Sequence, residues 1–216
     1  MPVSSYRKSR DLPDRIAVFP LDGALLLPRA ALPLNIFEPR YLNMVDDVLA
    51  GDRMIGMIQT RPGGEPEQPA LQNVGCAGRL TSFSEAPDGR YLISLTGVCR
   101  FSVAAEHETQ TPYRQITPEF EPFASDLGPA TLPEPFDRDA LVDALRAFLV
   151  SSDLAADWAS IENAPAEQLI NSLAMVCPFE AVEKQALLEA PTLEARREAL
   201  MTLMRLRAAG PEGGAA

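Results

Sequence analysis

The sequence predicts an α+β protein in which a mixed sheet or small β-barrel, with one helix inserted early, precedes a small helical bundle. Three differences in composition support this fold class. Residues 15–120 are rich in β-branched and aromatic residues broken by Gly and Pro, residues 121–136 contain four prolines, and residues 137–208 are rich in Ala, Leu, Glu and Arg. Because proline interrupts both helices and strand ladders, the middle segment is predicted to be a connector between two domains.

The first domain contains short apolar runs of the length expected for strands. A helix is predicted from Pro39 to Gly51, because apolar residues recur there at helical spacing. Pro33 places its strand at a sheet edge or beside a bulge. Residues 61–69 are predicted to form an exposed loop, and the turn 87–89 a hairpin. The predicted strands are 16–20, 25–27, 32–36, 54–59, 73–83, 91–95, 98–104 and 113–120.

The second domain carries helix-start residues at regular places along the chain. Four or five short helices are predicted, with starts at Asp137, Pro165, Pro178 and Thr192. The two ends of the chain are predicted to be a flexible leader, 1–14, and a disordered tail, 209–216, because neither has much apolar surface to bury.

Charge and composition limit the classes of partner. The formal net charge is −11 and only two of the 19 basic residues are lysines, so a nucleic acid partner is not expected. No apolar run is long enough to span a bilayer and the N-terminus has no apolar signal core, which predicts a cytoplasmic protein without a membrane partner. Cys76, Cys99 and Cys177 stand in no paired motif and are predicted to be small buried hydrophobic residues.

The chain has few residues suited to catalysis. Its one histidine, His107, follows a predicted strand, and its neighbours Glu106 and Glu108 should point away from it. No Gly-Lys pair exists to begin a nucleotide loop, Lys8 lies in the leader, and Lys184 is predicted to be a solvated residue on a helix. We therefore predict no catalytic residue, no metal site and no cofactor.

Glu38 stands alone in an otherwise apolar stretch, just before the helix predicted to start at Pro39. One interpretation makes it a buried acid at a ligand cleft, together with Arg40 and Arg100. The favoured interpretation makes it the cap or first-turn acid of that helix, paired with one of these arginines.

The segment FPLDGALLLPRAALPLNIFEPRYLNMV, residues 19–45, resembles the amino-terminal substrate-binding domain of the Lon protease family, which is also found in cereblon and in stand-alone bacterial proteins. Residues 74–75, 88–90 and 97–101 resemble later strands of that domain, and residues 183–189 with Arg196 or Arg197 resemble its helical part. The resemblance covers about residues 15–207.

The resemblance implies a PUA-like pseudo-β-barrel followed by a small helical bundle, in agreement with the fold predicted from the residues. It also implies a role in engaging polypeptides. The nucleotide loop and the Ser-Lys catalytic segment of the full protease are missing from this sequence, so protease activity is not expected of the chain.

We interpret the chain as a non-catalytic polypeptide-binding module, with an adaptor role in protein quality control as one form of it. The expected partners are unfolded or peptide-like protein segments, or a protease or chaperone. The candidate contact residues are Pro33, Asn35, Phe37, Tyr41, Met201 and Met204.

The alternative is a small-molecule binder or small enzyme that uses a cleft between barrel and bundle. Glu38, Arg40 and Arg100 would be its polar groups, because arginine suits planar carboxylates and phosphates.

Overall fold

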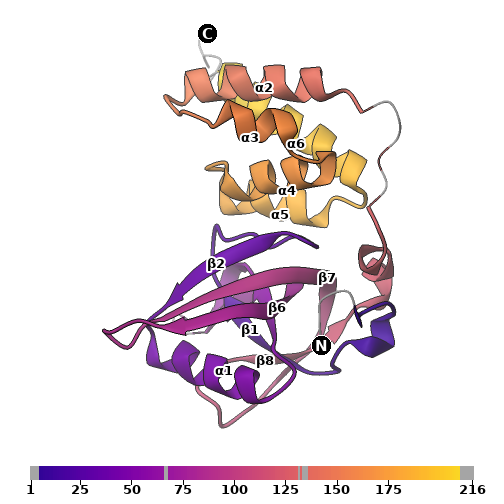
Figure 1. The fold of residues 1–216 in the computed structure, drawn as a ribbon. Coiled ribbons are helices and arrows are strands. Elements are labelled where there is room, and N and C mark those ends of the chain that lie inside the picture. Colours follow the sequence, from indigo (N-terminus) through magenta and orange to yellow (C-terminus); the bar gives the residue numbers. More distant parts are fainter. Residues whose placement is uncertain (1–4, 66–67, 131, 133–135, 210–216) are drawn as a thin grey trace. The chain divides into compact units, whose positions relative to one another are not determined.

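The computed structural model describes residues 5–65, 68–130, 132 and 136–209. The chain divides into two compact units, Met1–Pro129 and Ala130–Ala216, called here the β unit and the helical unit (Figure 1). The sheet lies in the first unit and a series of helices in the second, so the predicted α+β class is confirmed. Residues 1–4 of the predicted leader and 210–216 of the predicted tail lie outside the described residues.

The elements described in the β unit are strands, one α-helix and short 3-10 helices. The helix α1 (Pro39–Ala50) begins at the predicted proline and is followed by Gly51. The 3-10 helices are η2 (Ser9–Asp11) and η3 (Glu121–Leu127). The strands are β1 (Ile16–Pro20), β2 (Ala31–Ile36), β3 (Met54–Ile58), β4 (Thr60–Glu65), β5 (Gln68–Leu71), β6 (Val74–Glu85), β7 (Tyr91–His107) and β8 (Gln115–Glu119).

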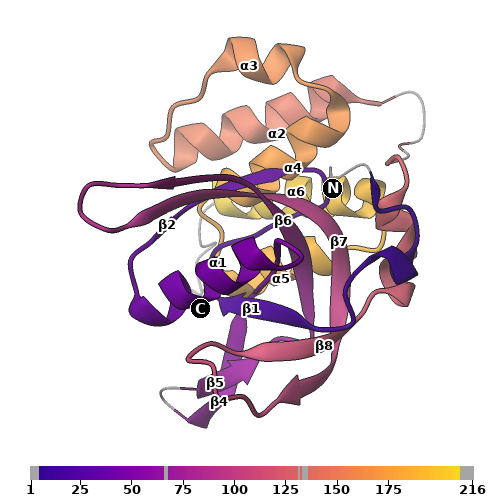
Figure 2. The same cartoon turned by 60° about the horizontal axis from the view of Figure 1, so that its bottom comes forward.

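Six strands form one sheet in the order β2-β7-β6-β3-β1-β8 (Figures 1 and 2). Only β1 and β3 run parallel, and the other pairs are antiparallel. Strand β8 also pairs with the second half of β7, from Ser102 to His107, while β2 pairs with its first half. The sheet therefore curls into a pseudo-barrel but does not close into a true barrel, because β2 remains an edge strand.

Pro33 lies in this edge strand, as its sequence predicts. The amide of Gly97 donates to the carbonyl of Ala30 at 2.9 Å, next to the pairing of Ala31 with Thr96. Since bonded positions alternate along an antiparallel ladder, we infer that the nitrogen of Pro33 faces the open edge, where no N–H is needed. A proline in this strand also hinders the pairing of another chain's strand with the open edge.

Strand β7 continues through Gly97, where the sequence suggested a break. The register with β6 shifts there, and Gly97 lies where the loop of residues 25–30 crosses the strand. A Cβ added at Gly97 would lie 2.0 Å from the carbonyl oxygen of Leu27. The run 25–27, predicted to be a strand, is therefore a buried loop segment packed on β7, and only glycine permits this close approach.

The predicted loop 61–69 is also wrong over its described part, 61–65 and 68–69, while residues 66–67 lie outside the described residues. Strands β4 and β5 form a two-stranded antiparallel hairpin, in which Gly63 and Gly64 adopt positive φ angles of 108° and 82°. Composition suggested a loop because Gly and Pro are common in turns, but here the glycines create the bulge between Arg61 and Gly64.

Two predicted domain boundaries need correction. Tyr6 and Leu12, within the predicted flexible leader, are buried in the same apolar cluster as Phe101 and Phe120. The first part of the predicted connector forms η3 and belongs to the β unit, because Asp126 is buried there against β7. Proline is compatible with this helix because Pro122 stands in its first turn.

Three helices start where they were predicted, at Asp137, Pro165 and Thr192, whereas α5 begins only after Glu180, beyond the predicted start at Pro178. The side chain of Asp137 accepts the amide of Ala140 at 3.0 Å, and Thr192 does the same for Ala195. A fifth, short helix begins after Asp157, where no start was predicted. The helices are α2 (Arg138–Ser151), α3 (Trp158–Asn163), α4 (Ala166–Val176), α5 (Ala181–Glu189) and α6 (Leu193–Ala209). No helix among the described residues is long and apolar enough to cross a membrane.

The Gly97→Ala variant tests the close approach of the 25–30 loop to β7. The added methyl group has to displace backbone atoms, so we expect a loss of about 1–3 kcal/mol or more in the free energy of unfolding, measured by urea denaturation. Gly128→Ala is the matched control, because its added Cβ would lie 3.5 Å from the nearest atom. Equal stabilities of the two variants would contradict this account.

Candidate functional site

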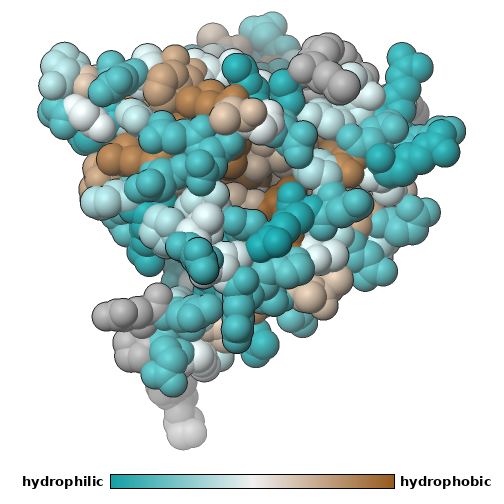
Figure 3. Space-filling view, turned by 90° about the horizontal axis from the view of Figure 1, so that it is seen from below, coloured by the Kyte–Doolittle hydropathy of each residue, from teal (hydrophilic) through white to brown (hydrophobic). Residues whose placement is uncertain are grey.

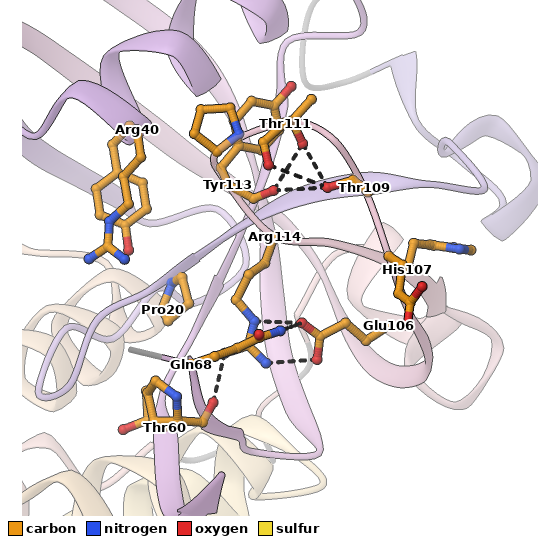
Figure 4. Close-up of a pocket in the computed structure, with 14 residues that line it drawn as sticks. Pro20, Arg40, Thr60, Gln68, Glu106, His107, Thr109, Thr111, Tyr113 and Arg114 are labelled. Carbon is orange, nitrogen blue, oxygen red and sulfur yellow. Dashed lines mark hydrogen bonds and ion pairs between the residues drawn. The ribbon is translucent and has the colours of Figure 1, made fainter. Parts of the chain in front are cut away.

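A cavity of about 960 Å³ lies in the β unit, where the end of β7 meets α1, β5 and the residues before β8 (Figure 4). Three prolines form part of its wall: Pro20, Pro69 and Pro112. Its charged residues are Arg40, Glu106, Glu108 and Arg114, and His107, Thr109, Thr111, Tyr41 and Tyr113 also line it.

Arg114 and Glu106 form a bidentate ion pair inside this cavity. The Nε and Nη2 atoms of Arg114 donate to the two carboxylate oxygens of Glu106 at 2.6 and 2.7 Å, and Nη1 donates to the carbonyl of Pro69 at 2.7 Å (Figure 4). This hydrogen bonding holds the pKa of Glu106 below its ordinary value. Arg114 thereby joins the β4–β5 hairpin to the end of β7.

Tyr113 and Tyr41 differ in what their hydroxyl groups contact. The Tyr113 hydroxyl donates to Asp47 Oδ2 at 2.6 Å, and burial together with this bond raises the pKa of Tyr113 to about 12. Tyr41 packs on Phe19 with ring centroids 4.2 Å apart, and only 6% of its surface is exposed. Among the described residues, no hydrogen bond is formed by the Tyr41 hydroxyl.

Arg40 and Glu38 form an exposed ion pair at the start of α1. Arg40 Nε donates to Glu38 Oε2 at 2.9 Å, and the Arg40 guanidinium lies over the Tyr41 ring, 4.6 Å from its centroid. The Glu38 backbone carbonyl accepts the first helical amides, but its side chain makes no capping bond. Glu38 therefore stands at the N-cap position, paired with Arg40, as the favoured sequence interpretation has it.

His107 contacts a threonine rather than either of its acidic sequence neighbours in the described structure. Its Nε2 atom lies 2.7 Å from Thr117 Oγ1, and Glu106 is bonded to Arg114 instead. In Figure 4 the imidazole points away from Arg114. Its position at the last residue of β7 agrees with the strand-end prediction.

Arg100 lies apart from Glu38 and Arg40, so the predicted polar cleft of these three residues is wrong. Arg100 is buried, and its Nε and Nη2 atoms donate to the two carboxylate oxygens of Asp126 at 2.8 and 2.9 Å. Its backbone amide donates to the same carboxylate at 3.0 Å. The physical reason is that a buried guanidinium needs an acceptor of opposite charge, which Asp126 of η3 supplies.

The structure divides the six predicted contact residues into exposed and buried groups. Pro33 and Asn35 are exposed on β2, and Phe37, directly after it, is 65% exposed. Tyr41 is buried except where it lines the cavity. Met201 and Met204 are buried within the helical unit, because α6 turns them toward its core, so they offer no adaptable surface.

Lys184 also departs from its prediction. It is 8% exposed rather than solvated, its Nζ donates to the carbonyl of Met175 at 3.1 Å, and burial lowers its pKa. All three cysteines are buried as predicted, and burial raises the pKa of Cys99 to about 12. No group of three His, Cys, Asp or Glu residues suited to a metal ion occurs in the described part of the chain.

A family model described as the ATP-dependent protease La (LON) substrate-binding domain matches residues 15–205. The chain belongs to this family. The matched model describes a substrate-binding domain, and it spans both units of the structure.

Curated relatives match through a small part of their length. Lon protease 1 of Herpetosiphon aurantiacus is 27% identical over 116 residues, which are 52% of this chain and 14% of that protein. Lon protease 2 of Syntrophobacter fumaroxidans is 25% identical over 203 residues, 88% of this chain and 24% of that protein. The chain thus corresponds to less than a quarter of these relatives.

Two solved structures share the fold. The Lon N-terminal domain protein from Xanthomonas campestris gives a TM-score of 0.58 at 21% identity, over 87% of this chain and 97% of that one. The N-terminal domain of Mycobacterium avium complex Lon protease gives 0.61 at 10% identity, over 91% and 99%. The α+β arrangement described above is therefore that of Lon N-terminal domains.

We expect Asp126→Ala to destabilise the β unit strongly. It leaves the buried Arg100 charge without its carboxylate, which costs about 3–5 kcal/mol in the free energy of unfolding. Asp88→Ala removes an exposed pair with Arg90 and should have little effect on stability. Urea denaturation of both variants checks the difference, and similar losses would show that Asp126 has no special role.

The Glu106–Arg114 pair predicts a pH dependence of stability. Because the folded pKa of Glu106 is depressed, its stabilisation is present above the ordinary glutamate pKa of 4.5 and is lost as the pH falls through the folded pKa. Glu106→Gln should therefore be less stable than the native chain at neutral pH, and the gap should shrink on acidification. Denaturation curves across this range measure it, and a gap that does not depend on pH contradicts the assignment.

Proposed function

We propose that the chain is a non-catalytic polypeptide-binding module located in the cytoplasm. The observation that carries the proposal is membership of a substrate-binding domain family over residues 15–205. An adaptor role, in which the chain brings unfolded or peptide-like segments to a protease or chaperone, is the form of this function that we favour.

The surface that we favour for this contact is the outer side of β2 and β7, called here the β2 face. It consists of Pro33, Asn35, Phe37, Leu92 and Ser94. Asn35 lies opposite Leu92 and Pro33 opposite Ser94, so these four side chains share one side of the sheet. Leu92 is 47% exposed, and Phe37 directly follows the strand.

The β2 face suits an extended apolar segment because its five residues are uncharged, whereas the chain as a whole has a net charge of −11. Phe37 supplies the largest exposed apolar side chain of the face, and aromatic anchors commonly dominate the energy of a protein interface. Pro33 limits backbone pairing along the open edge, so side-chain contacts should contribute more than added strand hydrogen bonds.

The small-molecule alternative loses its predicted site, because Glu38 and Arg40 pair at the surface while Arg100 is buried with Asp126. Polypeptide binding at an exposed surface therefore remains the leading proposed function.

The test is binding to a reduced, alkylated α-lactalbumin that cannot refold, with the native form of the same protein as control. We expect the purified chain to retain the unfolded form alone. Phe37→Ala should weaken this binding by about tenfold, the value of burying a large apolar side chain. Val150→Ala, at an 85% exposed position of α2, is the matched control and should change nothing.

Equal retention of the native and unfolded forms, or of neither, would refute the proposed function. Retention of the unfolded form by Phe37→Ala at native affinity would move the contact away from the β2 face.

A further inference from the structure

The cavity of the β unit contains a polar group that the fold does not explain. The Tyr41 side chain is more than nine-tenths buried and lines the cavity, yet its hydroxyl forms no hydrogen bond among the described residues. The hydroxyl oxygen is not among the described side-chain atoms that are fully buried without a partner, so it faces the open space of the cavity. This hydroxyl is therefore available to a molecule that enters the cavity.

Two guanidinium groups reach the same cavity from different walls. Arg40 projects from the first turn of α1 and Arg114 from the residue before β8 (Figure 4). Burial raises the pKa of Tyr41, while the positive charges of both arginines oppose that increase, which agrees with their closeness to the phenol. Phenol and guanidinium groups are all hydrogen-bond donors, so the three together favour an acceptor.

Both arginines keep unused donors. Arg114 has five N–H groups, of which the bonds to Glu106 and Pro69 use three. Arg40 pairs with Glu38 and lies over the Tyr41 ring, and the side chains of the pair are 47% and 43% exposed, so the pair contributes little. A ligand can thus bind both guanidinium groups without breaking the Arg114–Glu106 pair.

The charges of the lining limit the ligand to a weakly charged anion. Glu106 and Glu108 offset the two arginines, and the whole chain carries −11, so a phosphate dianion would be repelled. A carboxylate has one charge and a planar pair of oxygens that fits guanidinium donors. The volume of about 960 Å³ and the walls formed by Pro20, Pro69 and Pro112 leave space for more than the carboxylate alone.

We propose that this cavity binds a carboxylate group of a bound polypeptide through the Tyr41 hydroxyl and the guanidinium groups of Arg40 and Arg114. The proposal rests on the polypeptide-binding function above and adds to it a second recognition point. The carboxylate can come from the C-terminus of the polypeptide or from an Asp or Glu side chain, since the recognising chemistry is the same.

Figure 3 shows one face of the molecule, on which hydrophilic side chains predominate and hydrophobic ones form small separate groups. Such a surface offers no large apolar patch on that side, so polar recognition inside a cavity supplies selectivity that a broad apolar surface would not.

The experiment is isothermal titration calorimetry of the full chain with short N-acetylated peptides of Ala, Leu and Ser. One peptide has a free C-terminal carboxylate, a second is its C-terminal amide, and a third is the amide with one internal Glu. Succinate is titrated as a free dicarboxylate. We expect the free acid, the Glu peptide or both to bind about tenfold more tightly than the amide, the value of a hydrogen bond to a charged group.

Tyr41→Phe and Arg40→Gln should each remove most of this preference. Tyr41→Phe keeps the ring on Phe19 and should leave the thermal stability unchanged, because the hydroxyl has no protein partner to lose. Arg90→Gln is the matched arginine control, since Arg90 is 48% exposed and pairs with Asp88 two residues away, as Arg40 does with Glu38. Tyr91→Phe is the matched tyrosine control, because its hydroxyl bonds Asp46 outside the cavity.

The outcomes separate the two proposals. Equal binding of acid and amide peptides, or a preference that survives both cavity variants, overturns the carboxylate site while the polypeptide-binding function stands. If succinate binds and none of the peptides does, the assignment of the carboxylate to a polypeptide is overturned. A loss of stability in Tyr41→Phe would show a structural hydroxyl and also overturn the proposal. Failure of every peptide and of the unfolded protein refutes the proposed function itself.

Discussion

The fold of the β unit depends on one strand, the 17-residue β7, which pairs with three other strands. Its first half pairs with β2, its second half with β8, and β6 runs beside it on the other side. This is possible because the register shifts at Gly97, where the absence of a side chain lets the 25–30 loop lie against the strand. The position of β2 at an open edge, and with it the β2 face, follows from this arrangement.

The buried ion pair of Arg100 and Asp126 holds η3, the last element of the β unit, against β7. Arg100 lies in β7 just beyond the register shift, and its carboxylate partner lies in η3, 26 residues later in the chain. Arg29, from the loop that crosses Gly97, donates to the backbone carbonyls of Asp126 and Gly128. Two arginines thereby satisfy and position a proline-rich segment whose composition suggested a free connector.

The candidate cavity and the β2 face meet at the start of α1. Phe37 belongs to the β2 face and Arg40 and Tyr41 to the cavity, and only Glu38 and Pro39 separate Phe37 from Arg40 in sequence. An extended polypeptide on the β2 face would therefore have the carboxylate-binding groups within a few residues of its apolar contact. This gives a physical basis for recognising a segment by two features at once, an apolar side chain and a nearby acid.

The sequence by itself determined the fold class, most strand and helix starts and the restriction of Pro33 to an edge or a bulge, because these follow from local periodicity, caps and proline chemistry. The resemblance of residues 19–45 indicated the family. The sequence also singled out Glu38 and placed Phe37 among the candidate contact residues. Only the tertiary structure decided that Arg100 pairs with Asp126, that Arg114 joins Glu106, and that the hydroxyl of Tyr41 opens into a cavity. Such pairings join residues of separate elements, and charge or periodicity along the chain gives no signal for which distant partner a buried group will meet.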